Sequence, residues 1–220
     1  MRSRIVLLLF VVLAMMGLGV PAAHAQNELF LIGSNDPSGS NRAVSHYNAT
    51  TRALLGYFIS RTDVGMSDFH WGGTFGPDGN LYIADYYGGF IAKYSGATGA
   101  FMSYFGGIGA PVHIRFGPDG YLYVAANGGP AVVRFDATTG AYVDTPVPDG
   151  TDNLGYPQDL VFGVDGKLYI STYGTNAVLR YDPQTGTTET FVQPGSGGLS
   201  SARQMAFGPD GNLYVGALPA

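Results

Sequence analysis

Hydrophobic residues in this chain fall into short runs, separated by turns rich in Gly, Pro, Asp and Thr. In the segment from His113 to Asp136, apolar residues first alternate with other residues, and a continuous apolar run, Tyr121 to Val124, then follows a turn. Alternation is typical of a strand with one buried face, and a continuous run is typical of a strand buried on both faces. A third strand, 131–135, and a fourth beginning at Ala141 complete a predicted four-stranded antiparallel meander.

The same pattern recurs along the chain. The phrase Phe-Gly-Pro-Asp-Gly begins at Phe75, Phe116 and Phe207, and at Phe162 with Val in place of Pro, so that the starts lie 41, 46 and 45 residues apart. In such a phrase Pro presets φ for a tight turn, Asp bonds to the local backbone and Gly adopts the left-handed conformation. A repeat of this length with four short strands is typical of propeller blades. We therefore predict an all-β fold, a β-propeller of four-stranded antiparallel blades.

The repeats predict three full blades and two partial ones. They are 27–60 (partial), 70–105, 111–147, 157–192 and 203–220 (partial). The first group lacks the hairpin phrase and supplies three strands, and the last supplies two, so that the expected seventeen strands do not fill whole blades.

Two outcomes are open, an arc of about four to five blades and a closed four-blade ring with a spare strand. We favour the arc, an incomplete ring that belongs to a longer chain of about five to seven blades, six being a common number for such rings. On this interpretation the coding sequence continues past Ala220. Residues 26–220 alone would then associate or aggregate through the exposed edge at 213–216.

The N-terminal segment has the pattern of a targeting sequence. Two arginines precede an apolar run, 5–20, and small residues follow up to Ala25. This pattern predicts a signal peptide over 1–25, with the propeller domain over 26–220. The alternative, an uncleaved membrane anchor, is disfavoured because a span needs about 20 apolar residues. We expect a secreted, periplasmic or cell-surface protein with no stable membrane insertion after cleavage.

The composition of the chain limits the kinds of partner that it can be expected to bind. The chain has no cysteine, which excludes disulfides, thiol chemistry and a lipid-modified cysteine. Without residues 1–25 it has nine basic and sixteen acidic residues, a formal charge of −7. That sign argues against a nucleic-acid partner, and no basic run or amphipathic helix suggests a membrane surface. The expected partner is a protein, a glycan or a small molecule.

Comparison among the repeats separates scaffold from candidate site. Three places before each hairpin Phe, at the start of the innermost strand, the residue changes from blade to blade: Gly72, His113, Asp159 and Gln204. These positions should ring one end of the central channel. In one interpretation their polar side chains bond to backbone groups where the blades converge, and in the other they bind a ligand.

Further candidates lie on loops at the same end of the strands. They are His70, Trp71, Gln158 and Arg203 before the first strands, and Asp85, Asn127 and Thr172 at the ends of the second strands. A Trp beside a His suits stacking on a sugar or an aromatic ligand, and ordinary packing between blades is the alternative. Asp85 and Asp159 are candidates for a hard cation such as calcium on residue type alone, and we expect no cofactor.

The repeat phrases carry a resemblance to a known family. AFGPDGNLYV, AVLRYDPQTG and GSGGLSSARQMAFGPDGNLYV resemble the repeats of secreted bacterial NHL-type propellers, many of which carry a PEP-CTERM sorting segment. The likeness covers most of 29–216, and the sorting segment itself does not occur in this sequence. The same general architecture is used by gluconolactonase and regucalcin hydrolases and by streptogramin lyases, whose ligand and catalytic motifs match no positions here.

Two functions are therefore expected, from different classes. The leading hypothesis is an exported NHL-like propeller that acts as a ligand-binding or protein-interaction module, because the repeats are regular and no catalytic constellation is evident. The alternative is a metal-dependent lactonase or a streptogramin-lyase-like enzyme at the channel mouth, using His113, Asp159, Gln204 and Asp85.

Overall fold

The computed structural model describes residues 10–12, 28–34, 43–59, 70–129 and 131–217, which form antiparallel sheets. Four sheets have four strands each, and the fifth has two. Blade 1 contains β1 (Phe10–Val12), β2 (Glu28–Ser34), β3 (Ala43–Asn48) and β4 (Leu54–Ile59). Blade 2 contains β5 (His70–Phe75), β6 (Leu81–Asp85), β7 (Phe90–Tyr94) and β8 (Phe101–Gly107). These sheets confirm the predicted four-stranded antiparallel blade.

The remaining blades follow in chain order. Blade 3 contains β9 (Pro111–Phe116), β10 (Tyr121–Ala126), β11 (Ala131–Asp136) and β12 (Tyr142–Val147). Blade 4 contains β13 (Pro157–Phe162), β14 (Leu168–Thr172), β15 (Ala177–Asp182) and β16 (Thr187–Val192). A short 3-10 turn, η1 (Ser196–Gly198), leads to blade 5, which consists of β17 (Ala202–Phe207) and β18 (Leu213–Ala217). Among the residues described, no helix has the length and apolar character needed to span a bilayer.

The hairpin phrase forms the turn that the sequence predicts. In blade 3, Gly120 has a φ of 84° and the side chain of Asp119 accepts a hydrogen bond from the Tyr121 N–H at 3.3 Å. An L-residue with a side chain is strained at this φ, which explains the glycine. The turn aligns β9 with β10, so that Ile114 pairs with Val124.

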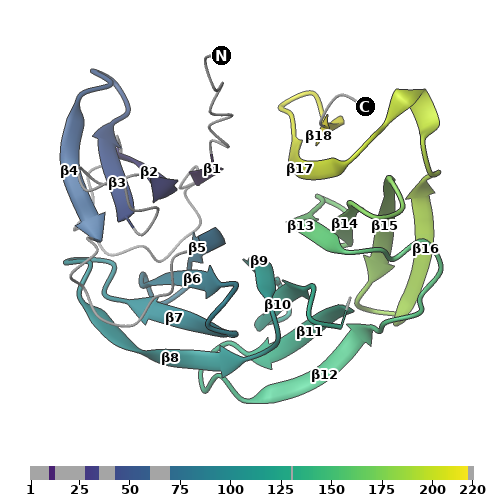
Figure 1. The fold of residues 1–220 in the computed structure, drawn as a ribbon, viewed down its shortest axis with the longest axis horizontal. Helices are drawn as coiled ribbons and strands as arrows, with labels where there is room; N and C mark the ends of the chain where they lie inside the picture. The colour runs from purple at the N-terminus through teal and green to yellow at the C-terminus, as the bar shows by residue number, and fades with distance from the viewer. Residues whose placement is uncertain (1–9, 13–27, 35–42, 60–69, 130, 218–220) are drawn as a thin grey trace, which may run out of the picture.

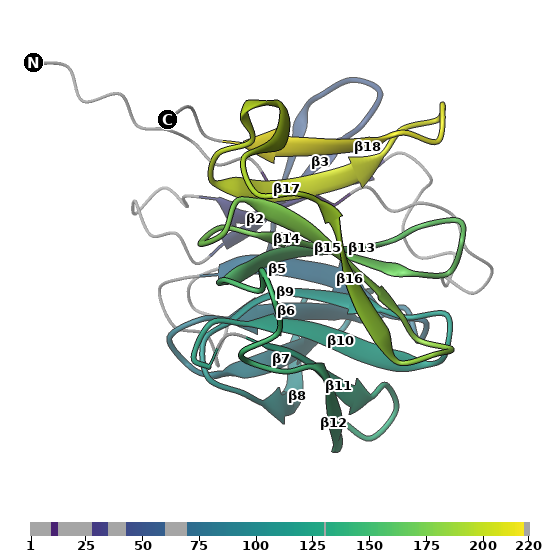
Figure 2. The same ribbon diagram turned by 90° about the vertical axis from the view of Figure 1, so that its right-hand side faces the viewer.

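The blades lie side by side around a common axis, as the ribbon shows (Figure 1). The view turned by 90° shows inner strands such as β13 and β17 running across the picture, roughly along that axis, whereas the outer strands β12 and β16 are steeply inclined (Figure 2). Inner strands of neighbouring blades are in contact, so that β5, β9, β13 and β17 follow one another around the centre. The arrangement is an arc whose first and last sheets share no strand pairing among the described residues.

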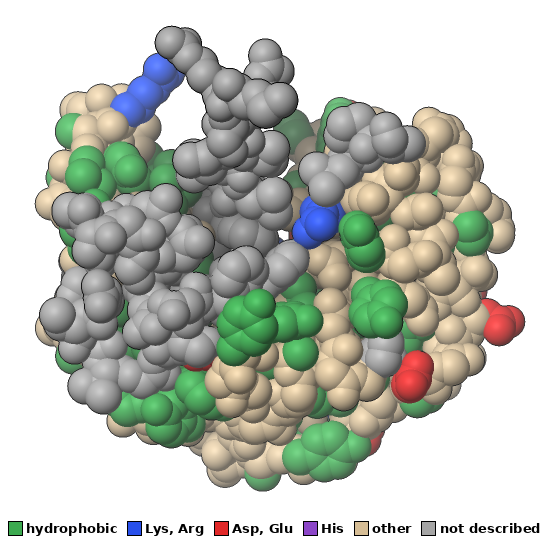
Figure 3. All heavy atoms as spheres, viewed as in Figure 1, with side chains coloured by type: hydrophobic (Ala, Val, Ile, Leu, Met, Phe, Trp, Pro, Cys, Tyr) green, Lys and Arg blue, Asp and Glu red, His purple; other side chains and the backbone are tan. Residues whose placement is uncertain are grey.

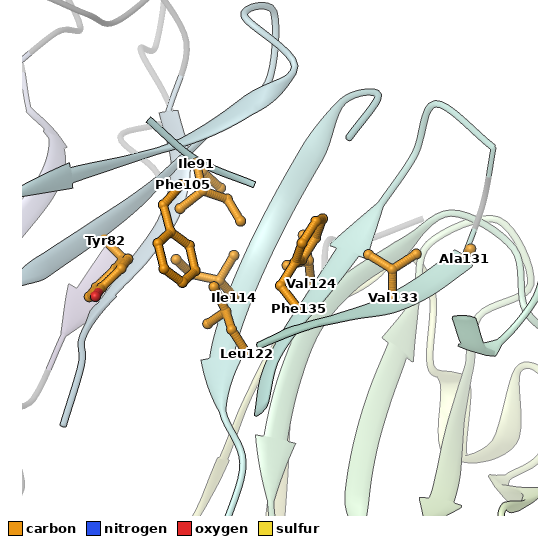
Figure 4. Packing of buried hydrophobic residues seen from close by; sticks show 10 residues of the cluster. Tyr82, Ile91, Phe105, Ile114, Leu122, Val124, Ala131, Val133 and Phe135 are labelled. Carbon is orange, nitrogen blue, oxygen red and sulfur yellow. The ribbon is translucent and has the colours of Figure 1, made fainter. Parts of the chain in front are cut away.

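The hydrophobic core lies between blades rather than inside one. One cluster combines Phe105 of blade 2 with Ile114 and Phe135 of blade 3, as the close view shows (Figure 4). Equivalent clusters join blades 1 and 2, blades 3 and 4, and blades 4 and 5. Each central blade is thus apolar on both faces, which is why its second strand reads as a continuous apolar run.

An aromatic contact joins each blade to the next. The Tyr82 ring of blade 2 packs edge-on against Phe116 of the next hairpin phrase, with centroids 5.0 Å apart. Tyr123 and Phe162 repeat this contact at 5.2 Å, and Tyr169 and Phe207 repeat it at 5.1 Å. Edge-on aromatic pairs contribute beyond their buried area. This contact explains why the hairpin phrase begins with Phe and why the following strand carries Tyr.

Blade 1 differs from the prediction. The sequence predicted three strands there, but Phe10–Val12 forms β1 and pairs antiparallel with β2, with Val11 opposite Leu31. The physical reason is that the inner edge of β2 presents unpaired backbone groups, which an apolar extended segment satisfies. The described chain therefore has eighteen strands rather than seventeen. The signal peptide expected over 1–25 includes these three residues and stays a prediction.

Candidate binding face at the inner strand ends

The candidate residues gather on one face of the arc. The first strand of each blade starts there and the second strand ends there, since His70 pairs with Asp85 and Pro157 with Thr172. Figure 3 shows this face, where hydrophobic side chains lie close to a basic one near the inner strands. We call it the mouth face.

Three of the four variable ring positions fit together directly. A Cβ atom added at Gly72 would lie 2.4 Å from Cδ2 of His113, so the missing side chain leaves room for the imidazole. On the opposite edge of the imidazole, Nδ1 of His113 lies 2.9 Å from Oδ1 of Asp159 in the next blade. The contact has the distance of an ion pair, but its angle is not that of an aligned hydrogen bond.

Asp159 connects blade 4 to both of its neighbours. Besides contacting His113, its carboxylate accepts hydrogen bonds of 2.7 Å from the Leu160 N–H and 2.7 Å from the Met205 N–H of blade 5. The Ser171 hydroxyl donates to the backbone carbonyl of Arg203 and accepts a bond from the Asp159 N–H. This geometry agrees with the structural interpretation of these positions, in which polar groups link converging blades.

Burial and charge set the ionisation of the pair. Burial lowers the pKa of His113 below its usual value. The negative charge of Asp159 acts to raise this pKa, and the positive charge of Arg115 lowers it, so that the net shift is downward. For Asp159, burial acts to raise the pKa, but the charges of His113 and Arg115 and the Met205 N–H bond outweigh it, and the pKa lies below its usual value. Asp159 is therefore ionised at neutral pH, and burial favours the neutral form of His113.

This arrangement predicts a loss of stability in mild acid. Because folding lowers the pKa of His113 below 6.5, the unfolded chain takes up this proton first as the pH falls. The free energy of unfolding should therefore decrease as the pH is lowered through about 6.5. Thermal unfolding followed by circular dichroism at a series of pH values measures the slope, and His113→Gln should flatten it. Equal slopes for the two proteins would contradict this assignment.

Other predicted site residues are also used inside the blades. The Thr172 hydroxyl is fully buried, lies 2.6 Å from that of Thr175 and accepts a 3.2 Å bond from the Ala177 N–H. Asp85 is fully buried and accepts a 2.8 Å bond from the Gly88 N–H. These two side chains shape the loops that follow β14 and β6, and the structure does not present them to solvent.

The remaining candidates differ in exposure. Gln158 is buried, and its amide donates a 3.3 Å bond to the Tyr156 carbonyl. Asn127, Arg203 and Gln204 are half-buried. The backbones of His70 and Trp71 belong to β5, but their side chains lie outside the described part of the structure.

The described residues form no group of three or more His, Asp or Glu side chains that could hold a metal ion. The two carboxylates considered for calcium, Asp85 and Asp159, each have hydrogen-bond donors of their own. A pocket of about 440 Å³ lies away from the mouth face, lined by the hairpin turns of blades 2 and 3. Its lining consists largely of hairpin-phrase residues that recur in each blade.

The sequence did not lead us to predict that three tyrosines are exposed on the mouth face. Tyr87 follows β6 and is 68% exposed, while Tyr156 and Tyr173 flank the inner strands of blade 4 at 52% and 43%. The Tyr173 N–H donates to the Tyr156 carbonyl at 3.1 Å, which holds the two loops together. The guanidinium of Arg203 lies 5.0 Å from the Tyr173 ring centre. Their sequence signal was a large aromatic residue beside a Gly, in the loop after a second strand for Tyr87 and Tyr173 and in the loop between blades 3 and 4 for Tyr156.

No protein-family model and no curated protein sequence matches this chain. Several solved structures, however, are similar to it in fold. Hydrazine synthase from Kuenenia stuttgartiensis is similar with a TM-score of 0.65 and 22% identity, over 86% of this chain and 52% of that one. Virginiamycin B lyase from Staphylococcus aureus is similar with a TM-score of 0.64 and 17% identity, over 89% of this chain and 60% of that one.

The chain has the β-propeller fold. An extracellular domain of a one-component system from B. thetaiotaomicron is similar as well, with a TM-score of 0.61 and 16% identity, over 86% of this chain and 26% of that one. This propeller thus spans between about a quarter and three fifths of the lengths of these chains. At such identities the likeness concerns the fold alone, and function has to be argued from the mouth face.

Proposed function

We propose that this propeller is an exported, non-enzymatic binding module of the NHL-like type, which recognises its ligand on the mouth face. One observation carries the proposal. The Asp159 carboxylate and the Ser171 hydroxyl near the inner strand ends are buried and bonded to blade 5, whereas three tyrosines on the same face are exposed. Exposed aromatic residues at the end of a rigid scaffold are characteristic of recognition sites.

The chemistry of the face points to ligands with flat or CH-rich surfaces. Tyr87, Tyr156 and Tyr173 offer rings for stacking, and the hydroxyl at the end of each ring can bond to a polar ligand group. Arg203 adds positive charge beside Tyr173. A protein surface or a glycan with an acidic group fits this combination, and nucleic acid does not fit a chain with a formal charge of −5.

The test is a triple variant, Tyr87→Ala, Tyr156→Ala and Tyr173→Ala. The purified chain is screened against a glycan array and a displayed peptide library, and the affinity of each hit is measured for both proteins. Loss of stacking on one ring or more should weaken binding at least about 10-fold.

Tyr142→Ala is the matched control, because Tyr142 is 61% exposed but lies on the outermost strand of blade 3. Its affinity should equal that of the unmodified protein. Ligands that bind the triple variant and the unmodified protein equally well would place recognition elsewhere and contradict the proposal.

A lyase-like activity is the second candidate function. It is favoured by the fold similarity to virginiamycin B lyase, one structure of which holds quinupristin in a catalytically inactive variant, and by the His113–Asp159 pair near the channel. Incubation with quinupristin followed by chromatography tests it. Conversion that disappears in His113→Gln would support the lyase and overturn the non-enzymatic proposal, whereas an unchanged substrate would remove this candidate.

A further inference from the structure

A basic residue of the third strand pairs with the hairpin Asp in blades 2, 3 and 4. In blade 2, Nζ of Lys93 lies 2.8 Å from Oδ2 of Asp78. The Tyr82 hydroxyl donates a 3.0 Å bond to the same oxygen. In blades 3 and 4 the corresponding cations are Arg134 and Arg180, which lie 3.7 Å and 4.0 Å from the carboxylates of their hairpins. These blades thus place a cation at the same point of the repeat.

The outer strand adds a second carboxylate to this cation in blades 3 and 4. Arg134 is opposite Asp144 in the strand register, and its Nε donates a 2.7 Å bond to Oδ1 of that residue. Arg180 is opposite Glu189, and its Nε donates a 2.7 Å bond to Oε1 of that residue. Each of these arginines therefore has one carboxylate from the hairpin and another from the outer strand.

Blade 2 lacks the second carboxylate. Lys93 is opposite Ser103 on β8, and Ser103 is exposed. In the part of the chain that the structure describes, Asp78 is the only carboxylate within ion-pair distance of Lys93. An ammonium group has more N–H donors than one carboxylate oxygen uses. Beside Lys93 there is therefore a place for a second anion that blade 2 itself does not fill.

The pocket of about 440 Å³ lies against this lysine. Lys93 and Asp78 form the charged part of its lining, and Phe116, Pro118 and Ala137 of blade 3 provide an apolar wall. Its volume is in the range of sites that hold small molecules. A ligand in this pocket meets the positive charge of Lys93 on one side and apolar side chains of the next blade on the other.

The charges beside the pocket favour an anion with a single negative charge. Burial acts to raise the pKa of Asp78, but hydrogen bonds from Lys93, Asn80 and Tyr82 outweigh it and lower this pKa to about 2. Burial acts to lower the pKa of Lys93, but its bond with Asp78 outweighs this effect and raises the pKa above its usual value. Both groups are therefore charged at neutral pH. A doubly charged phosphate would be repelled by Asp78 more strongly than a carboxylate would.

We propose that the pocket between the hairpins of blades 2 and 3 binds a small monocarboxylate with an apolar body. The ligand carboxylate is the second acceptor for Lys93, and the apolar body packs on Phe116 and Pro118. The choice of a carboxylate rests on blades 3 and 4, where the same chain places Asp144 or Glu189 against the corresponding cation. This site is separate from the mouth face and goes beyond the proposed function.

The probe is phenylacetate, and its neutral amide, phenylacetamide, is the matched control compound. Each is titrated into the purified, isotopically labelled full-length chain, and two-dimensional NMR follows the amide signals of Lys93, Phe116 and Ala137. Phenylacetate should shift these signals with a Kd of about 1 mM. Phenylacetamide should bind at least about 10-fold more weakly, because it has no charge to pair with Lys93. Unshifted signals at these residues, or equal binding of the two compounds, would overturn the proposal.

Substitutions at Ser103 test the missing carboxylate directly. Ser103→Asp supplies the acidic residue that blades 3 and 4 have at this position, and its pairing with Lys93 should weaken phenylacetate binding at least about 10-fold. Ser103→Asn is the matched control, because Asn has nearly the same size as Asp without the charge, and it should change the Kd by no more than about 2-fold. Thermal unfolding confirms that both variants are folded. Equal affinities of the two variants for phenylacetate would contradict the proposed role of Lys93.

A substitution in the apolar wall separates binding inside the pocket from binding to the lysine alone. Ala137→Leu puts a larger side chain into the pocket and leaves the pair of Lys93 and Asp78 in place. It should weaken phenylacetate binding about 10-fold, because the apolar body loses its space. An unchanged affinity would show that the compound binds Lys93 from solvent rather than in the pocket, and the proposal would then be wrong.

Discussion

Asp159→Ala is expected to lower the free energy of unfolding by about 3 kcal/mol. The substitution removes the acceptor for the Leu160 and Met205 N–H groups and leaves the buried His113 ring without its charged neighbour. Buried donors that lose their partner keep the cost of leaving water, which makes such losses larger than the worth of the original bonds. The effect should also be cooperative across blades, because Asp159 joins blades 3, 4 and 5.

Chemical denaturation followed by tryptophan fluorescence or circular dichroism measures this loss. Asp149→Ala is the matched control, because Asp149 is an exposed turn carboxylate, and it should change the free energy of unfolding by no more than about 0.5 kcal/mol. Similar losses for Asp149→Ala and Asp159→Ala would show that the inter-blade bonds contribute little.

Gly99→Ala should have the second large effect, with a loss of about 3 kcal/mol. Gly99 ends the Thr-Gly turn after β7, with a φ of 73°. A Cβ atom there would lie 1.8 Å from the carbonyl oxygen of Phe58 in blade 1. Because that atom is backbone, the blades would have to separate locally to accept the methyl group.

Gly186→Ala provides the matched comparison for that substitution. Gly186 occupies the same turn in blade 4, with a φ of 71°, but a Cβ atom there would have no neighbour within 4 Å. Only the left-handed strain of about 1 kcal/mol is expected. Urea unfolding of the two variants measures the difference, which reports contact between blades 1 and 2. If both variants lose the same stability, these blades do not pack as described.

Much of the fold was predictable because each blade is built from local signals. The hairpin phrase specifies its own turn, as Asp119 and Gly120 show, and the alternating and continuous apolar runs specify which strands are half-buried or fully buried. The predicted strands of blades 2, 3 and 4 are confirmed. The strand of blade 1 formed by Phe10–Val12 was not predictable, since no hairpin phrase precedes β2 and its pairing joins segments distant in sequence.

The candidate site was predictable only in part. Comparing the same position in successive repeats singled out Gly72, His113 and Asp159, and the structure places these residues beside one another in neighbouring blades. This comparison did not show that the Asp159 carboxylate accepts a hydrogen bond from the Met205 N–H of the next blade, because Met205 is 46 residues away in the sequence. The comparison also did not indicate that Tyr87 is exposed, because the exposure of a side chain depends on whether a neighbouring loop covers it.

The sequence by itself determined the blade: its strand order, its turns and the Phe and Tyr positions that pack one repeat on the next. These follow from short-range rules, in which φ preferences, side-chain alternation and turn hydrogen bonds act within a few residues. Only the tertiary structure decided which polar residues form hydrogen bonds between blades and which tyrosines stay on the surface. Those outcomes depend on what a neighbouring blade brings to each position, and burial is a property of that arrangement rather than of the repeat.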